Sequence, residues 1–133
     1  MKKRRAALLK LSREHHTALV LTLRISQAND AAAVSSLMKS LPRIFQHELD
    51  PHFRVEEEVL LPRLEKAGEI ALVQRTFEEH KELRDMVARI ASGDSASLKA
   101  FGVKLNAHVR FEERELFTRA EAVLPAGFLD VPG

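Results

Sequence analysis

The sequence predicts an all-α protein, an up-down-up-down four-helix bundle, and three observations point to it. The apolar residues are mostly Leu, Ala and Val, and aromatic residues make up only 5% of the chain; Leu and Ala propagate helices well. No stretch alternates apolar and polar residues in the manner of a strand. Gly and Pro divide the chain sparingly into four amphipathic segments joined by short breaks, which is typical of a bundle.

Four helices are expected, at about 4–27, 31–66, 69–91 and 95–122. A polar break follows the first helix, and its Asn29 or Asp30 is suited to cap the second. Glycine marks the ends of the second and third helices, at Gly68 and Gly93.

Prolines predict two irregular regions. Pro42, Pro51 and Pro62 lie inside the second segment, and a proline in a helix removes a hydrogen bond and kinks it. We therefore expect a bend or break near residue 50, and another near 41. From Pro125 onward, proline and glycine predict a non-helical tail. A chain of 133 residues corresponds to one domain over 1–133, with the bundle over about 4–122 and the tail over 123–133.

Composition excludes several classes of protein. The chain has no Cys, which excludes disulfides, thiolate zinc sites and iron–sulfur clusters, so a metal would need nitrogen and oxygen ligands. Its net charge is +2, from 21 basic and 19 acidic residues, and no basic stripe suggests nucleic acid. The basic residues at 2–5 are expected to form a solvated end. The apolar run behind them is too short for a signal peptide, and no run could span a membrane, so we expect a cytoplasmic protein without a membrane or nucleic-acid partner.

Polar residues interrupt the apolar stripe of every helix near its middle. A histidine occurs in each stripe, and two stripes carry a glutamate one turn later: the set is His15, His52, Glu56, His80, His108 and Glu112. His52 and Glu56 are four residues apart, so they share a helix face. A buried carboxylate without a partner is costly. Polar groups that converge from four helices need a common partner, and a cation is the simplest one.

An internal repeat supports the same interpretation. Residues 52–57 match 108–113 at an offset of 56, and residues 14–15 match 79–80 at an offset of 65. The first helix pair therefore resembles the second. Two such pairs would supply two sets of two His and one Glu, which suits a two-metal centre bridged by both Glu carboxylates.

These motifs resemble those of the hemerythrin-like family, the HHE cation-binding domain. The resemblance is carried by Glu14-His15, by His52 through Glu57 followed by Leu61-Pro62, by Glu79-His80, and by His108 through Glu113 followed by Leu116-Phe117. It covers residues from about 8 to 120 and implies a non-haem di-iron site with about two Fe per chain. The implied role is sensing or handling of oxygen, peroxide, nitric oxide or iron, with a small oxidant such as dioxygen, peroxide or nitric oxide as the partner.

The chain departs from the oxygen-carrying hemerythrins, which resemble it but have a fifth His from a His-x-x-x-His pair on the third helix. Here the positions one turn either side of His80 are Thr76 and Arg84. Neither side chain suits a metal, so both metals are expected to be open and similar. This difference favours redox sensing or turnover over reversible oxygen carriage.

Several alternatives remain at this point. His16 competes with His15, and Glu113 competes with Glu112, although Glu113, Glu57 and Glu58 are expected to form mainly a solvated acidic face. Zinc or manganese suits the same donors as iron. A metal-free helical interaction module is the rival hypothesis, and an enzyme using the same metals is a third.

Two further expectations concern packing. The phenylalanines of the stripes, Phe77 among them, are expected to fill the core. Val20 and Leu21 widen the apolar surface of the first helix and suggest a homodimer.

Overall fold

The computed structural model describes residues 3–133, and this part of the chain contains helices and no strands. The α-helices are α1 (Ala6–Ser26), α2 (Ala31–Ile44), α3 (Asp50–Val55), α4 (Leu61–Lys66), α5 (Ile70–Ala91), α6 (Ala96–Phe111), α7 (Phe117–Val123) and α8 (Ala126–Leu129). Three π-helical turns, η1 (Phe45–Leu49), η2 (Glu56–Leu60) and η3 (Glu112–Leu116), lie between them.

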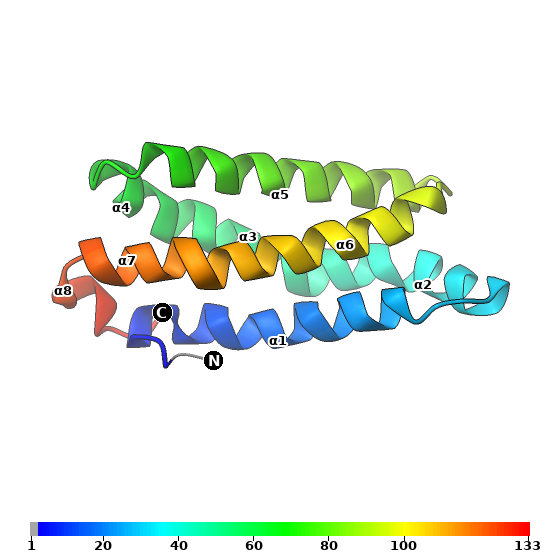
Figure 1. Cartoon of the computed structure of the whole chain (residues 1–133), viewed down its shortest axis with the longest axis horizontal. Coiled ribbons are helices and arrows are strands. Elements are labelled where there is room, and N and C mark those ends of the chain that lie inside the picture. Colours follow the sequence, from blue (N-terminus) through cyan, green and yellow to red (C-terminus); the bar gives the residue numbers. More distant parts are fainter. Residues whose placement is uncertain (1–2) are drawn as a thin grey trace.

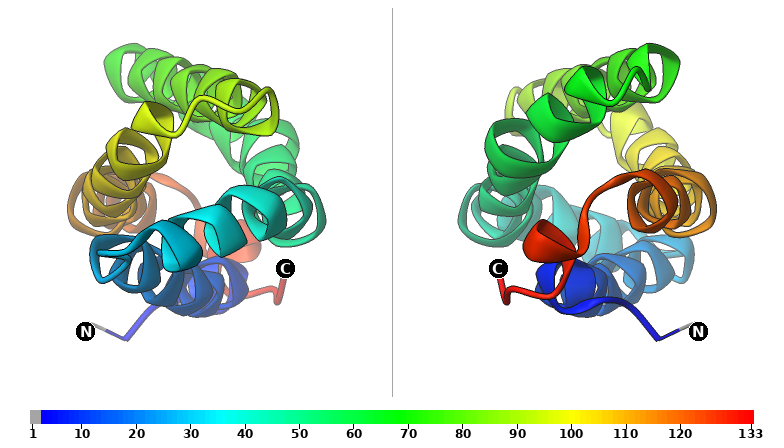
Figure 2. Two further views of the ribbon diagram at one scale, coloured as in Figure 1. Left: turned by 90° about the vertical axis from the view of Figure 1, so that its right-hand side faces the viewer. Right: turned by 90° about the vertical axis from the view of Figure 1, so that its left-hand side faces the viewer.

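The long helices form a bundle whose members alternate in direction. The turns η1 and η2 join α2, α3 and α4 into one rod without a gap, and η3 joins α6 to α7 in the same way. Figure 1 shows these two rods running opposite to α1 and α5, and Figure 2 shows all of them packed around a common axis. The predicted all-α bundle is confirmed.

The helix boundaries follow the signals in the sequence. The carboxylate of Asp30 accepts a hydrogen bond from the backbone N–H of Ala33 at 2.7 Å, so Asp30 is the cap of α2. Gly68 follows α4 and Gly93 follows α5, with φ values of +90° and +101°, a conformation that favours glycine. Short loops of this kind keep successive rods antiparallel and adjacent.

A π-helical turn, η1, stands where a break was expected near residue 50. A second π-helical turn, η2, precedes Pro62. Proline lacks an N–H, and its ring clashes with the carbonyl four residues earlier. Just before each of these prolines, the backbone N–H bonds the carbonyl five residues back, from Asp50 to Phe45 and from Leu61 to Glu56. The extra residue in each π-helical turn accommodates the following proline without a break in the helix. At Pro42 the helix α2 continues without interruption.

The apolar core consists of two clusters with a polar layer between them. One cluster includes Ile25, Leu83 and Leu105, and the other includes Leu8 and Leu116. On each rod the predicted polar residues lie at or near the boundary between the two clusters. The two apolar clusters therefore enclose the polar layer from both ends of the bundle.

The contact between α1 and α6 is the most extensive between two helices, and it depends on a glycine. A Cβ built on Gly102 would lie 2.9 Å from Cγ2 of Ile25. A larger residue there would require the Ile25 side chain or its helix to shift. This contact holds together the two helices that carry His15 and His108.

Three packing expectations are wrong. Phe77 is 44% exposed, while its neighbour Thr76 is fully buried and donates a hydrogen bond from its hydroxyl to the carbonyl of Leu72. The buried face of a helix is narrow, so an error of one residue in the predicted stripe exchanges which of two neighbouring side chains is buried. Arg4 is buried rather than solvated; Lys2 lies outside the described residues. The tail contains the short helix α8, whose Leu129 packs into the core.

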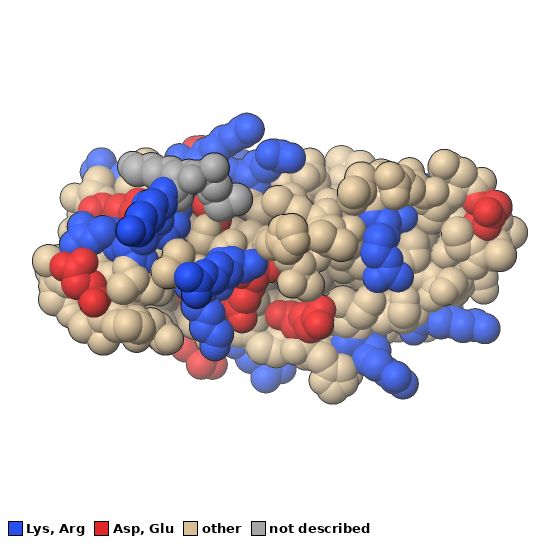
Figure 3. Space-filling view, turned by 90° about the horizontal axis from the view of Figure 1, so that it is seen from below, with Lys and Arg blue, Asp and Glu red and all other residues tan. Residues whose placement is uncertain are grey.

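The surface of α1 also differs from expectation. Leu21 is buried, so the exposed apolar side chains of this helix are Val20 and Leu23. Figure 3 shows the face seen from below, where the right-hand half carries fewer charged side chains than the left-hand half. A homodimer through this face stays a prediction. No helix among residues 3–133 is long and apolar enough to cross a membrane.

Candidate metal centre

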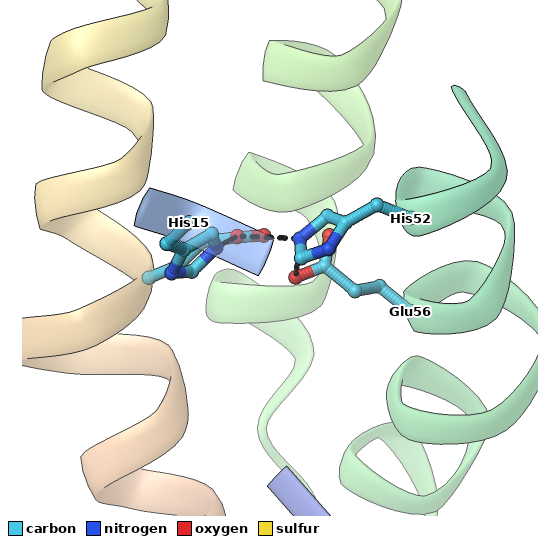
Figure 4. Close-up of side chains that lie close together, drawn as sticks. His15, His52 and Glu56 are labelled. Atoms are coloured by element: carbon cyan, nitrogen blue, oxygen red, sulfur yellow. Dashed lines mark hydrogen bonds and ion pairs between the residues drawn. The ribbon is translucent and has the colours of Figure 1, made fainter. Parts of the chain in front are cut away.

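The structure brings all six predicted site residues together in the polar layer. Their exposed fractions are 0% for Glu56, His80 and Glu112, 1% for His108, 2% for His15 and 4% for His52. Figure 4 shows His15, from α1, pointing towards His52 and Glu56, which both come from the rod of α2, α3 and α4. One imidazole each comes from α1, from the α2–α4 rod, from α5 and from the α6–α7 rod, and the two rods also contribute one carboxylate each.

The two central carboxylates occupy equivalent places in the fold. Glu56 is the first residue of η2, and Glu112 is the first residue of η3. The turn at Glu112 has no proline to cause it, and its carbonyl accepts from the N–H of Phe117. π-Helical turns inside α-helices are frequent at functional sites. Their recurrence at the same position of both halves indicates that they serve the placement of these carboxylates.

The Nε2 atoms of all four rings face the central carboxylates. The shortest distances from Nε2 to a carboxylate oxygen are 2.7 Å (His15 to Glu112), 3.1 Å (His108 to Glu112), 3.1 Å (His80 to Glu56) and 3.3 Å (His52 to Glu56). Glu112 also lies 3.6 Å from His80 and 3.8 Å from His52, so it contacts every ring. The carboxylates thus lie between the two pairs of rings.

These donors form two overlapping groups that fit a metal ion. The first group is His15, His52, Glu56 and Glu112, and the second is Glu56, His80, His108 and Glu112. Within each group the donor atoms lie within 4.8 Å of one another. Ligands held about 2.0–2.2 Å from one ion lie at most about 4.4 Å apart, so a slight contraction suffices. Both carboxylates belong to both groups, as bridging ligands would.

The inward-facing atoms also lack hydrogen-bond partners. Six buried atoms of this cluster have none: Nε2 of His52, His80 and His108, both carboxylate oxygens of Glu56, and Oε2 of Glu112. Each unpaired buried polar group costs about 1–3 kcal/mol, so six would cancel most of a domain's stability of about 5–15 kcal/mol. A metal ion would satisfy these atoms together, and the cluster therefore fits a metal site.

Four outer carboxylates orient the rings from behind. Each accepts a hydrogen bond from the Nδ1–H of one ring: Glu113 from His15 at 2.6 Å, Glu14 from His52 at 3.0 Å, Glu57 from His80 at 2.7 Å and Glu79 from His108 at 2.7 Å. Such a contact fixes the ring and directs its Nε2 lone pair inward, which is how proteins orient metal-binding imidazoles.

The outer carboxylates were not assigned this role from the sequence. Glu57 and Glu113 were expected to be solvated, but their side chains are only 16% and 12% exposed, because His80 and His15 bind them. A signal was present: each is the second acid of a repeated Glu-Glu pair. Likewise Glu14 and Glu79 precede the equivalent histidines His15 and His80. The repeat therefore contains the orienting residues as well as the inner ones.

Arginines hold three of the four outer carboxylates. Arg84 pairs with Glu57 at 2.8 Å and also with Asp50, Arg75 pairs with Glu79 at 3.0 Å, and Arg4 contacts Glu113 at 3.3 Å. Arg84, one turn after His80, is thus a partner of a carboxylate behind the site and not a solvated charge.

The cluster shifts the pKa of its four histidines and of Glu112. Burial by itself lowers the pKa of His52, but the charge of Glu56 and contact with Glu112 outweigh it and raise the value to about 11. By the same balance, the pKa of His80 rises to about 9 and that of His108 to about 10, and the pKa of His15 also rises. Burial would raise the pKa of Glu112, yet His108 and its neighbours hold it well below the usual range. Protons therefore compete with a metal for these rings.

The competing residues lie outside the cluster. His16 is exposed, and Glu58 is exposed on the surface of η2 as expected. Glu113 faces Nδ1 of His15 from outside, while Glu112 faces Nε2 from inside. The geometry thus favours His15 over His16, and Glu112 over Glu113.

Comparison with known proteins agrees with this geometry. The chain is 33% identical, over 75 residues, to uncharacterized proteins of Mycobacterium bovis and of two strains of Mycobacterium tuberculosis. The match covers 52% of this chain and 45% of each relative, so the chain spans about half the length of the curated relatives it matches. No solved structure matches it significantly. The family model of the hemerythrin HHE cation-binding domain matches residues 7–120, and the chain belongs to that family.

Proposed function

We propose that the chain is a non-haem di-iron protein of the cytoplasm. One iron would be held by His15 and His52, the other by His80 and His108, and both Glu carboxylates would bridge the pair. The observation that carries this proposal is the pair of donor groups that share Glu56 and Glu112. A single closed zinc site needs four ligands, and six converging donors exceed that number.

The donor set supports iron but suits other metals too. Imidazole and carboxylate bind iron, manganese and zinc. Two imidazoles and two bridging carboxylates give each ion four donors, whereas iron commonly takes six. The remaining positions suit water or a small oxidant such as dioxygen, peroxide or nitric oxide. Zinc or manganese in the same site is the alternative.

We propose sensing, turnover or handling of such oxidants, or of iron, rather than reversible oxygen carriage. The positions that could supply a fifth His carry Thr76, whose hydroxyl bonds the carbonyl of Leu72, and Arg84, whose guanidinium bonds Glu57 and Asp50. Neither side chain is available to a metal. The extra imidazole that distinguishes oxygen carriers therefore has no counterpart at these positions.

The test is metal analysis of the protein purified from iron-supplemented cells, combined with its visible spectrum. About two irons per chain are expected from the ligand count. Because the chain has no Trp or Tyr, metal absorption stands out against a weak protein background. A ratio near one would indicate a mononuclear site. A ratio near zero after refolding with excess ferrous iron, with unchanged thermal stability, would instead support a metal-free interaction module.

A further inference from the structure

A pocket reaches the metal centre from the side of His52. It has a volume of about 280 Å³ and lies where α1 faces η1 and α3. Glu14, Thr17, His47 and Glu48 line its outer part, and the ligands His15, His52, His108 and Glu112 line its inner part. His80 and Glu56 are not among its lining residues. The two metal positions, expected to be open alike, therefore differ in access.

The other three corners of the site are covered by an aromatic ring and a guanidinium. Behind His80, the ring of Phe53 stacks at 4.0 Å between centroids, and Arg84 lies 5.6 Å from the Phe53 ring. Phe117 stacks on His15 at 5.3 Å with Arg4 beside it, and Phe111 lies 6.2 Å from His108 with Arg75 over it at 3.9 Å. At each of these three corners a ring and an arginine that is paired with the outer carboxylate cover the histidine from outside.

The corner at His52 is built differently. Its outer carboxylate, Glu14, has a side chain that is 38% exposed, and no arginine or lysine of residues 3–133 forms an ion pair with it. The internal repeat shows why. Lys10 and Val55 stand where the other half has Arg75 and Phe111. Lys10 is exposed, and Val55 is 44% exposed.

The pocket has the charge of a cation path. Two carboxylates and an imidazole, from Glu14, Glu48 and His47, stand at its outer part, and its described lining contains no lysine or arginine. At its inner end the Nε2 of His52 is buried and has no hydrogen-bond partner. Acidic clefts concentrate cations and accelerate their entry. An incoming divalent ion would thus meet suitable donors from the surface to the first ligand.

We propose that divalent metal enters and leaves the bundle through this pocket, passing Glu48, His47 and Glu14 before His52 and His15. This proposal rests on the proposed metal-binding function and adds the route of loading. Rings and paired arginines cover the other three corners from outside, whereas the acidic lining of this pocket attracts a cation. A route changes the rates of uptake and release and leaves the final number of bound ions the same.

The charge of the route is tested with Glu48→Lys, and Glu78→Lys is its control. Glu78 is an exposed acid on α5 outside the pocket, so both variants change the net charge equally. Uptake of Co²⁺ by the metal-free protein is followed by stopped flow through the visible absorption of bound Co²⁺. At low ionic strength, Glu48→Lys should slow uptake about tenfold, and the difference should shrink as salt screens the charge. Glu78→Lys should load like the parent protein.

The space in the route is tested with Thr17→Trp, and Gln74→Trp on the exposed face of α5 is the control. The indole ring should fill the outer pocket and slow both uptake of Co²⁺ and its removal by excess EDTA, several-fold each. It should leave the final ratio of about two ions per chain intact. The indole is the first tryptophan of the chain, so Co²⁺ passing it should also quench its fluorescence.

Two results separate the route from the site. If Glu48→Lys and Thr17→Trp load at the rates of their controls while all proteins bind two ions, the route proposal is wrong and the metal site stands. If the parent protein binds no Co²⁺, Fe²⁺ or Zn²⁺, the metal-binding proposal itself fails. Slower uptake by both pocket variants, with both controls unchanged, supports entry at His52.

Discussion

Glu112 and Glu113, adjacent in the sequence, contact the two nitrogens of one imidazole ring. Glu112 lies 2.7 Å from Nε2 of His15, and Glu113 lies 2.6 Å from Nδ1 of the same ring. One carboxylate therefore faces the centre of the site and the other holds the ring from behind. The π-helical turn that begins at Glu112 helps two neighbouring side chains reach opposite sides of a ring on another rod.

This division of roles predicts different effects for two matched substitutions. Glu112→Gln removes the charge of a bridging donor that contacts all four rings, so the protein should lose most of its bound metal. Glu113→Gln leaves the inner donors intact and weakens only the orientation of His15, which should lower metal affinity about 10- to 100-fold. Metal content after dialysis and competition with a chelator measure the two effects. Equal loss in both variants would contradict the assignment of inner and outer roles.

The two adjacent histidines of α1 offer a second matched pair. His15→Ala should lower metal content and remove much of the thermal stabilisation that metal provides, because metal bound only by the native state stabilises that state. His16→Ala should change neither, since His16 is exposed and belongs to neither donor group. Metal analysis and thermal unfolding with and without metal test this. Loss of metal from the His16 variant alone would shift the register of α1 by one residue.

The pKa shifts predict how the stability of the metal-free protein depends on pH. The pKa values of His80, His108 and His52 rise from 6.5 to about 9, 10 and 11. A raised histidine pKa contributes stability that is complete below pH 6.5 and is lost as pH rises through the folded-state values. The metal-free protein should therefore melt at progressively lower temperature from pH 6.5 to 11.

The metal-loaded protein is the control for this titration. Its rings would bind metal in the neutral form, so its melting temperature should fall less over the same range. The stabilisation caused by metal should accordingly be larger at pH 9 than at pH 6. Calorimetry in matched buffers measures both curves, and parallel curves would show that the rings do not exchange protons for metal.

The contact of α1 with α6 predicts a packing effect. Gly102→Ala places a Cβ 2.9 Å from Ile25; overpacking costs about 1–3 kcal/mol, and the gain in helix propensity returns roughly 1 kcal/mol, so we expect a net loss of about 1 kcal/mol. Gly127→Ala is the control, because nothing lies within 4 Å of its Cβ. Urea unfolding measures both variants. In a protein that already carries Ile25→Ala, Gly102→Ala should cost less stability than it does in the parent protein.

Much of the fold and of the inner site could be predicted from the sequence, because both depend on spacing along single helices. The boundaries of α1 and α5 agree within two residues with those expected, and the four histidines lie on regular stripes. The repeat also related His52 and Glu56 to the second half. These properties are local or recur along the chain.

The remaining features depend on contacts between rods. Glu57 lies behind His80 only because the α2–α4 rod and α5 are side by side, and the sequence alone does not show that placement. The π-helical turns absorb Pro51 and Pro62 without a break, a result that depends on packing of the whole rod. The open corner at His52 likewise arises from side chains of several elements.

The last prediction concerns chemistry with oxygen. Reduced, iron-loaded protein should be oxidised by air and should stay oxidised when the air is replaced by inert gas. The physical reason is the ligand set: Thr76 and Arg84 are engaged elsewhere, so neither adds the extra imidazole of the oxygen carriers. The pocket at His52 also gives water and small oxidants a path to the centre, and water favours completed oxidation over reversible binding. The visible spectrum is followed through repeated cycles of air and inert gas. A spectrum that disappears on purging and returns with air over many cycles would show that four histidines suffice for carriage. Conversion in a single cycle, reversed only by a chemical reductant, is the expected outcome.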